Sequence, residues 1–165
     1  MNHKKDHGKD FEEMVYKNLL KRFPKENIFR NIKFNYRNKE TEIDILAVSG
    51  KKIYIFECKN LNNPVRGKLI DNYWYEYINY RWYRILNPFF QNRRHVDAVY
   101  NYLKSELNSS RFEIKSFVVM KQLKYISDLS SREFIYDPYE ISRYNFKNEK
   151  DGIILDLLKE KAGIA

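Results

Sequence analysis

The sequence predicts an α/β domain in which helices cover a mixed β-sheet. An amphipathic segment with helical periodicity comes first, several strand-like segments follow it, and a second helical segment precedes a further strand. That order of elements is typical of layered α/β domains. The chain has 165 residues, no internal repeat and no Pro/Gly-rich break, so we expect one domain over residues 1–165.

The first helix is predicted over residues 10–23. Its apolar side chains recur on one stripe at about 100° per residue, and Pro24 stops it. The stripe consists of Phe11, Met14, Val15, Leu19 and Phe23. Glu12 projects within this stripe, whereas Glu13 points to solvent. Glu12 is therefore expected on the buried side of the helix.

Strands are predicted next. Residues 28–36 form the first of them. Residues 41–60, TEIDILAVSGKKIYIFECKN, contain two strands joined by a two-residue turn at Gly50-Lys51. Residues 65–86 are expected to hold two more extended segments.

The second half of the chain alternates helix and strand. Asn87 can cap a helix over residues 87–107, and Pro88 suits its first position. The buried stripe of this helix comprises Phe89, Val96, Val99, Leu103 and Leu107. The remaining predicted elements are a strand over residues 111–120, a short strand over 134–138 and a closing helix over 152–161.

Charge and composition narrow the function classes. Lysine and arginine number 31 and aspartate and glutamate 22, which gives a net charge of +9. This favours a polyanionic partner, most simply nucleic acid, although an AT-rich genome would also enrich lysine. The single cysteine, Cys58, excludes an intrachain disulfide framework and a cysteine-cluster zinc site. No apolar run approaches the ~20 residues of a membrane span, so we expect a soluble cytoplasmic protein without a membrane partner.

Charged residues near the two central strands form a specific pattern. Strand alternation sends Glu57 and Lys59 to the same face. A turn at residues 50–51 then places Asp44 opposite Glu57, and Glu42 opposite Lys59. Two facing carboxylates about 5 Å apart repel each other, and a bound cation removes the conflict. Oxygen ligands favour Mg²⁺, Mn²⁺ or Ca²⁺ over zinc.

Ordinary structural roles compete with this metal site. Glu42 and Lys59 could form a cross-strand ion pair, and Asp44 could accept a hydrogen bond from a neighbouring backbone group. Glu12 adds a third carboxylate if its helix packs on the same face of the sheet, and is otherwise a surface residue. The facing pair Asp44 and Glu57 is the hardest to explain without a cation.

The same residues carry a resemblance to a known family. Asp44, a strand, and then Glu57-x-Lys59 form the pattern of the PD-(D/E)xK nuclease superfamily, and more narrowly the chain resembles the NERD (nuclease-related) domain. The resemblance rests on Gly8-x-x-x-Glu12, TEIDILAV, IFECKN, Gly67 followed by Trp74, and NPFFQ, in the family's order over residues 8–107. One departure is Phe11, at a position where the family usually has a second glycine.

The resemblance implies a restriction-endonuclease-like fold, with a mixed β-sheet flanked by helices, and metal-dependent hydrolysis of phosphodiester bonds. We expect DNA as the substrate in preference to RNA, although the sequence alone does not distinguish them. Asp44 and Glu57 would hold Mg²⁺, with Mn²⁺ as the alternative ion. Glu12, directly or through water, and the main-chain carbonyl of Cys58 would be further ligands. Lys59 would position the attacking water and offset developing negative charge.

Three further sets of residues are candidates for contacts with nucleic acid. By the same resemblance, Gln91 lies near the active site and contacts phosphate or orients the lysine; otherwise it is a polar residue on the helix surface. Arg93 and Arg94 could reach phosphate or form a solvated face. In the run NYWYEYINYRWYR, Arg81 and Arg84 stand between aromatics that could stack on bases. The favoured interpretation of this run is a twisted hairpin with one buried and one tyrosine-rich side.

The predicted function is a metal-dependent nuclease. The first alternative is a catalytically inactive module of the same fold that binds nucleic acid or another partner. The second is a subunit that acts only with a partner or as a homo-oligomer. The presence of Asp44, Glu57 and Lys59 together favours the active enzyme.

Overall fold

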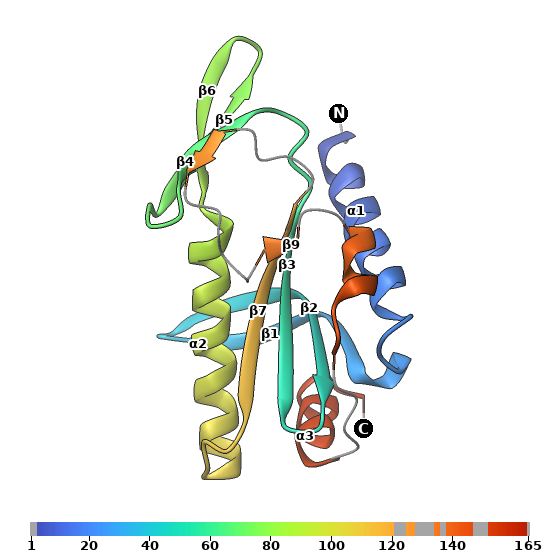
Figure 1. The fold of residues 1–165 in the computed structure, drawn as a ribbon. Coiled ribbons are helices and arrows are strands. Elements are labelled where there is room, and N and C mark those ends of the chain that lie inside the picture. The colour runs from blue at the N-terminus through green and yellow to red at the C-terminus, as the bar shows by residue number, and fades with distance from the viewer. Residues whose placement is uncertain (1–2, 121–124, 128–133, 136–137, 147–151, 165) are drawn as a thin grey trace.

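The computed structural model of the protein describes residues 3–120, 125–127, 134–135, 138–146 and 152–164 (Figure 1). A five-stranded sheet has the order β1-β2-β3-β7-β9, and a four-stranded sheet has the order β6-β5-β4-β8. The strands are β1 (Ile28–Tyr36), β2 (Lys39–Ser49), β3 (Lys52–Lys59), β4 (Val65–Lys68), β5 (Tyr73–Ile78), β6 (Arg81–Leu86), β7 (Glu113–Met120), β8 (Tyr125–Ser127) and β9 (Phe134–Ile135). The helices are α1 (His3–Leu19), α2 (Pro88–Leu107) and α3 (Ile153–Lys161), with 3₁₀ turns η1 (Lys25–Asn27) and η2 (Pro138–Arg143).

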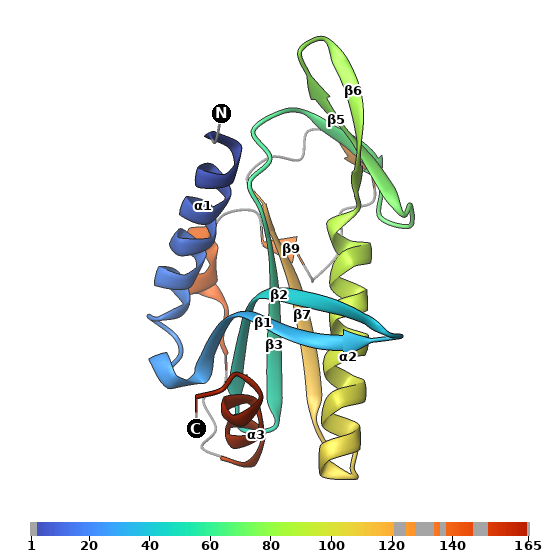
Figure 2. The same ribbon diagram turned by 180° about the vertical axis from the view of Figure 1, so that it is seen from behind.

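The large sheet is mixed, as predicted. Strands β1, β2 and β3 form an antiparallel meander, while β3–β7 and β7–β9 are parallel pairs. Helix α1 and η2 lie on one side of it, and α2 lies on the other (Figures 1 and 2). This architecture is consistent with a restriction-endonuclease-like fold. None of the described helices combines the length and apolar composition needed to span a membrane.

Alternation along β3 explains the two layers of the core. Tyr54 and Phe56 pack with Val15 of α1 on one face. Ile53 and Ile55 pack with the α2 side chains Ala98 and Val99 on the other. Glu57 and Lys59 continue the series of Ile53 and Ile55. The charged end of β3 therefore points to the α2 face of the sheet.

A bend in the β1–β2 hairpin lies next to this charged end. The predicted register holds from Ser49–Lys52 to Ile45–Phe56, where the β2–β3 ladder ends. Asn31 of β1 has a left-handed φ of 51°, and the β1–β2 pairing skips the Asn31–Asp44 position. The hairpin turns away from β3 at this point. The predicted cross-strand pairs Asp44–Glu57 and Glu42–Lys59 are therefore not part of the ladder.

Three other expectations need correction. Helix α1 starts at His3 and ends at Leu19; a turn follows, so Phe23 is buried outside the helix rather than on its stripe. Residues 65–86 form three strands rather than two, because β4 pairs with both β5 and β8. In the predicted short strand, Phe134–Ile135 pairs with β7, and residues 136–137 lie outside the described residues.

The start of α2 is built as the sequence predicts. Asn87 accepts a hydrogen bond from the Phe89 N–H at 2.9 Å, and Pro88 follows it. The Asn87 amide also donates to the carbonyls of Leu69 and Asp71, at 3.0 and 2.6 Å. One buried side chain thereby fixes the first turn of α2 against the loop that connects β4 to β5.

Gly67 and Trp74, two residues of the family resemblance, are packing partners. The buried Trp74 indole occupies the space that a Cβ on Gly67 would need. Its Nε1–H donates to the Lys68 carbonyl at 2.8 Å. The pair holds β4 against β5 and leaves the other face of these strands to solvent.

Candidate active site

Glu57 is a fully buried carboxylate at the end of β3. The Lys59 ammonium lies 2.8 Å from Oε1, and His95 Nδ1 lies 3.4 Å from Oε2. Within the described residues neither carboxylate oxygen has a hydrogen bond of good geometry, although the Lys59 contact acts to lower the Glu57 pKa as a hydrogen bond would. A buried carboxylate in this state is costly.

Burial is also the main cause of the change in the pKa of Glu57. Burial raises its pKa to about 7, the Lys59 charge opposes the rise, and the Asp44 charge adds to it. For Lys59, burial acts to lower the pKa, but the contact with Glu57 and the charge of Asp44 together outweigh it, and the pKa is raised. The ion pair therefore favours the charged form of Lys59, but it does not offset the cost of burying the charged form of Glu57.

Asp44 lies at the bend where β2 leaves β3. Its Oδ2 accepts a hydrogen bond from the Cys58 N–H at 2.8 Å, so a side chain replaces the backbone pairing that ends there. This is the capping role considered from the sequence. Burial raises the pKa of Asp44, while the Cys58 N–H and the Lys59 charge act to lower it. The capping contact engages one oxygen of the carboxylate.

Glu12 approaches from the opposite side. Its helix, α1, packs on the face that carries Phe56 and not on the face of Glu57, so the condition of a shared face is not met. The Glu12 carboxylate lies 3.2 Å from Arg30 Nη2. Burial raises its pKa, and the charge of Asp44 contributes further. Glu12 is thus close enough to sense Asp44 but is held by an arginine.

Arg30 also binds the neighbouring acid. Its Nη1 lies 2.6 Å from Glu13 Oε2. The Glu13 side chain is 41% exposed and that of Glu12 15% exposed, so the predicted order of burial is confirmed, although both share Arg30. Sequence reasoning did not select Arg30. The feature that could have identified Arg30 is its position opposite Ile45 in the β1–β2 pair, because Ile45 faces α1.

We therefore expect Glu12→Gln to reduce the nuclease activity that the family resemblance implies by at least tenfold, and Glu13→Gln to reduce it by less than threefold. Of the two glutamates, only Glu12 is mostly buried, and the charge of Asp44 raises its pKa. Initial cleavage rates of the two variants at saturating Mg²⁺ measure the difference, and each variant loses one Arg30 partner, which makes them a matched pair. Equal losses would show that Arg30, and not Glu12, carries the effect.

His95 is a second residue whose place the sequence did not reveal. It is buried on α2 against Glu57. Burial, and then the charges of Lys59 and Arg94, lower its pKa to about 4, so the ring is neutral. The sequence feature that could have indicated its burial is its spacing of four residues from Val99, which places both side chains on the same side of the helix. Gln91 is half-buried one turn earlier on the same side of α2, and its role stays a prediction.

The Cys58 side chain packs against the α1-side core. Burial raises the pKa of its thiol well above the usual value, which matches the predicted role of a small core residue. Its carbonyl stays a predicted ligand.

The donors fit a cation in part. In the residues that the structure describes, no three His, Cys, Asp or Glu side chains are gathered as a metal-binding group. Glu57 offers two buried oxygens without directed hydrogen bonds, and Asp44 lies at the adjacent bend. Carboxylate oxygens suit Mg²⁺ or Mn²⁺. Two carboxylates and a carbonyl are the donors that such an ion would use here, and Glu12 would join after leaving Arg30 or through water.

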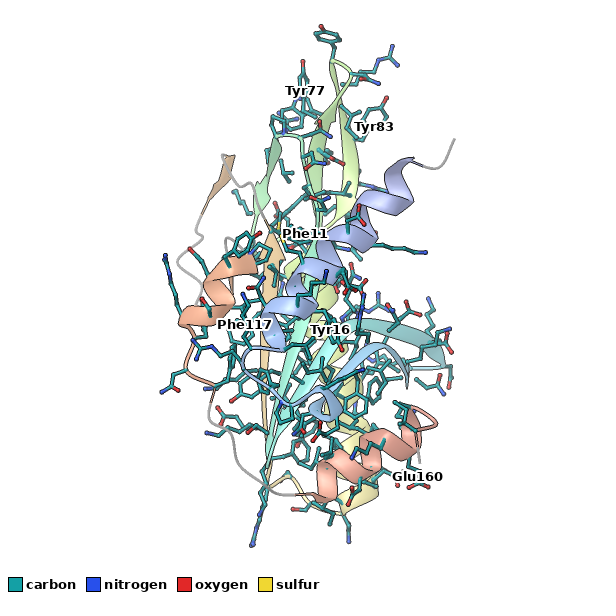
Figure 3. All side chains as sticks on the ribbon, turned by 90° about the vertical axis from the view of Figure 1, so that its right-hand side faces the viewer. Phe11, Tyr16, Tyr77, Tyr83, Phe117 and Glu160 are labelled. Carbon is teal, nitrogen blue, oxygen red and sulfur yellow. The ribbon has the colours of Figure 1, made fainter. Side chains whose placement is uncertain are left out.

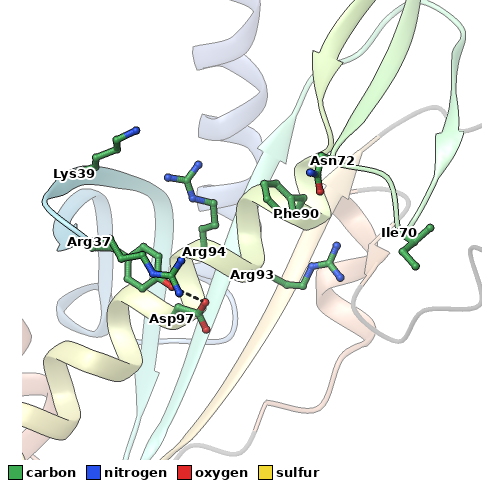
Figure 4. A pocket seen from close by; sticks show the side chains of 9 residues that line it. Arg37, Lys39, Ile70, Asn72, Phe90, Arg93, Arg94 and Asp97 are labelled. Atoms are coloured by element: carbon green, nitrogen blue, oxygen red, sulfur yellow. Dashed lines mark hydrogen bonds between the residues drawn. The ribbon is translucent and has the colours of Figure 1, made fainter.

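A basic groove lies between the β1–β2 turn and the first half of α2 (Figure 4). It has a volume of about 740 Å³ and is lined by Tyr36, Arg37, Lys39, Ile70, Asn72, Phe90, Arg93, Arg94 and Asp97. The Tyr36 hydroxyl donates to Asp97 Oδ2 at 3.2 Å, which fastens the turn to the helix. Four cations and one carboxylate give this groove a positive field. Arg93 and Arg94 belong to it; Arg37 and Lys39 were not selected from the sequence.

Arg81 and Arg84, the other predicted contacts, lie on opposite faces of the β5–β6 hairpin. Arg84 pairs with Tyr75, and Arg81 pairs with Ile78. The hairpin has one tyrosine-rich side and one side that buries Trp74, as the favoured interpretation of this run predicted.

Comparison with known proteins identifies the family. The Nuclease-related domain (NERD) family matches residues 7–121. No curated protein and no solved structure matched the chain. The matched stretch runs from α1 through β7 and includes Glu12, Asp44, Glu57 and Lys59. Because the match covers more than half of the 165 residues, the chain belongs to the nuclease-related domain family, whose placement in the PD-(D/E)xK superfamily agrees with the fold.

Proposed function

We propose that the protein is a metal-dependent nuclease that hydrolyses phosphodiester bonds in nucleic acid, with DNA as the preferred substrate. The observation that carries the proposal is the buried Glu57 carboxylate, which lacks a directed hydrogen bond and has Lys59 Nζ at 2.8 Å. Asp44 at the adjacent bend supplies a second carboxylate. Family membership supports the same chemistry.

Asp44, Glu57 and the Cys58 carbonyl would hold Mg²⁺ or Mn²⁺, with Glu12 as an additional ligand. When bound, the ion supplies Lewis acidity and a water of lowered pKa. A cation at Glu57 competes with Lys59 for the carboxylate. The Lys59 ammonium is then available to hold the attacking water or to offset negative charge on the phosphate.

Incubation of the pure protein with supercoiled DNA, linear duplex DNA, single-stranded DNA and RNA tests the proposal. Cleavage of DNA with Mg²⁺ or Mn²⁺, and none in EDTA, is the expected result. The alternative is an inactive binding module, which is favoured by the contacts of Glu12 with Arg30 and Glu57 with Lys59. Binding of nucleic acid without cleavage under any metal condition would establish that alternative.

The basic groove supports a polyanionic substrate. Replacing Arg93 and Arg94 with alanine should weaken DNA binding at least fivefold at 0.1 M salt. It should also reduce the slope of log K against log[salt] by up to about 1.8, since each phosphate contact contributes about 0.9. Fluorescence anisotropy in EDTA at several salt concentrations measures both quantities.

The charge-matched control is the Lys104→Ala, Arg111→Ala double variant. It removes two cations from outside the groove, so its binding should stay within twofold of wild type. An equal loss in both double variants would assign binding to net charge rather than to the groove.

A further inference from the structure

The three strands β4, β5 and β6 present one outward face of aromatic and cationic side chains. Cross-strand pairs Arg66–Tyr75, Tyr75–Arg84 and Tyr77–Trp82 place these residues on one side. We name this side the aromatic–arginine face. It consists of Arg66, Tyr73, Tyr75, Tyr77, Trp82 and Arg84. The other side of the same strands carries the buried Trp74.

The side chains of this face form a row of close contacts between rings and guanidinium groups. The Arg84 guanidinium lies 4.4 Å from the Tyr73 ring centroid. The Arg66 guanidinium lies 4.2 Å from the Trp82 ring and 5.6 Å from the Tyr75 ring. Tyr77 and Trp82 follow at 5.0 Å between ring centroids. Cations and rings therefore line the whole face.

The aromatic–arginine face is open to solvent on a projecting element. The β5–β6 hairpin extends beyond the body of the molecule (Figure 1), and Trp82 and Tyr75 are 36% and 41% exposed. Among the residues that the structure describes, the face carries no acidic residue; Glu76 belongs to the other side, where it accepts a hydrogen bond from Asn63 at 2.9 Å. Exposed aromatics interleaved with arginines form a surface for an anionic partner with flat rings.

We propose that the aromatic–arginine face binds unpaired nucleotides of a nucleic-acid strand. Bases would stack on the tyrosine and tryptophan rings, and Arg66 and Arg84 would contact the phosphates. A duplex already stacks its bases on each other, so only unpaired bases offer a free ring face. The inference rests on the proposed function for its substrate class, and it names the strand form that the protein holds.

Strand geometry fits this occupant. Side chains two residues apart on one face of a strand are separated by about 6.6 Å. That is close to twice the ~3.4 Å thickness of a stacked base, so one base fits between successive rings. The Arg84 guanidinium now lies over the Tyr73 ring, and the Arg66 guanidinium lies over the Trp82 and Tyr75 rings. Both groups would move to the phosphates. The aromatic–arginine face is also close to Lys59 along the chain, because only residues 60–64 separate the end of β3 from β4.

Binding measurements in EDTA test the inference without cleavage. Fluorescently labelled dT20, rU20 and a 20-base-pair duplex serve as probes. Trp82→Ala and Tyr75→Ala should each weaken dT20 or rU20 binding about tenfold, because one stacked base contributes about 1–3 kcal/mol. Duplex binding should stay within twofold. The two single-stranded probes show whether the face accepts DNA, RNA or both.

Tyr83→Ala is the matched control. Tyr83 neighbours Trp82 in β6, is 49% exposed and lies on the other side of the hairpin from Tyr77 (Figure 3). It should bind dT20 as wild type does. Trp82→Phe should restore most of the binding lost in Trp82→Ala, and equal urea midpoints should show that all variants fold.

Equal weakening by Tyr83→Ala, or equal loss of duplex binding in Trp82→Ala, would overturn the inference. So would a dimer in size-exclusion chromatography that Trp82→Ala dissolves with no change in dT20 binding, because a second copy of the chain would then cover the face. Absence of nuclease activity with normal dT20 binding defeats the proposed function alone. Cleavage with unchanged dT20 binding in Trp82→Ala defeats this inference alone.

Discussion

Lys59→Ala and Asp44→Asn should each reduce DNA cleavage by at least 100-fold while leaving DNA binding within about threefold of wild type. Loss of one preorganised charged group at a reacting centre typically costs 10²–10³ in rate. Lys59 lies beside the buried Glu57. Asp44 places a carboxylate at the bend in β2, where it accepts a hydrogen bond from the Cys58 N–H. Binding, in contrast, should come from cations spread over the surface.

Single-turnover cleavage and anisotropy in EDTA separate these two effects. Lys52→Ala is the control, because Lys52 lies at the other end of β3 and pairs with Glu113 at 3.9 Å. That variant should cleave normally. Wild-type cleavage by either Lys59→Ala or Asp44→Asn would remove the residue from the site, and a parallel loss of binding would assign it to substrate contact instead.

Local rules were enough to predict the central features of the site. A two-residue turn at Gly50 sets the β2–β3 register, and alternation then orients Glu57 and Lys59. The cap at Asn87 follows from a side chain that can accept a bond from a free helix N–H. These features depend on neighbours in the chain or on a single strand pair, so the sequence carries them directly.

Other features depend on contacts that local rules do not reach. The left-handed φ of Asn31 bends the β1–β2 hairpin, and no glycine marks the position. This bend replaces the predicted Asp44–Glu57 ladder pair with a hydrogen bond to the Cys58 N–H. His95 meets Glu57, and Arg30 meets Glu12, only after helices pack on both faces of the sheet.

The Lys59 contact with Glu57 leads to the most discriminating prediction. Two interpretations of this contact predict opposite effects of neutralising Glu57 on the stability of the protein. In the first, the pair is a structural ion pair, and neutralising Glu57 would strand Lys59. In the second, burial of Glu57 outweighs the pair, and neutralising the carboxylate relieves a cost. The raised pKa of Glu57, about 7 against an ordinary 4.5, favours the second interpretation.

The sign of the pH dependence follows from that shift. Between pH 4.5 and 7 the folded state keeps a proton on Glu57 that the unfolded state has released, so stability falls as pH rises through this window. The loss is complete above pH 7 and amounts to about 3 kcal/mol at most. Glu57→Gln removes the titrating group, and Lys59, with 31% of its side chain exposed, can turn to water.

Glu57→Gln should therefore melt roughly 5 °C above wild type in EDTA at pH 8, and within about 2 °C of it at pH 5, since 1 kcal/mol corresponds to about 2–4 °C for a domain of this size. Added Mg²⁺ should raise the wild-type melting temperature at pH 8 by mass action and leave the variant unchanged. Differential scanning calorimetry measures both proteins under these three conditions. A lower melting temperature of the variant in EDTA at pH 8, together with no effect of Mg²⁺ on wild type, would make Glu57 a structural partner of Lys59. The buried carboxylate would then no longer be an argument for a metal site, because its charge would already be balanced within the protein.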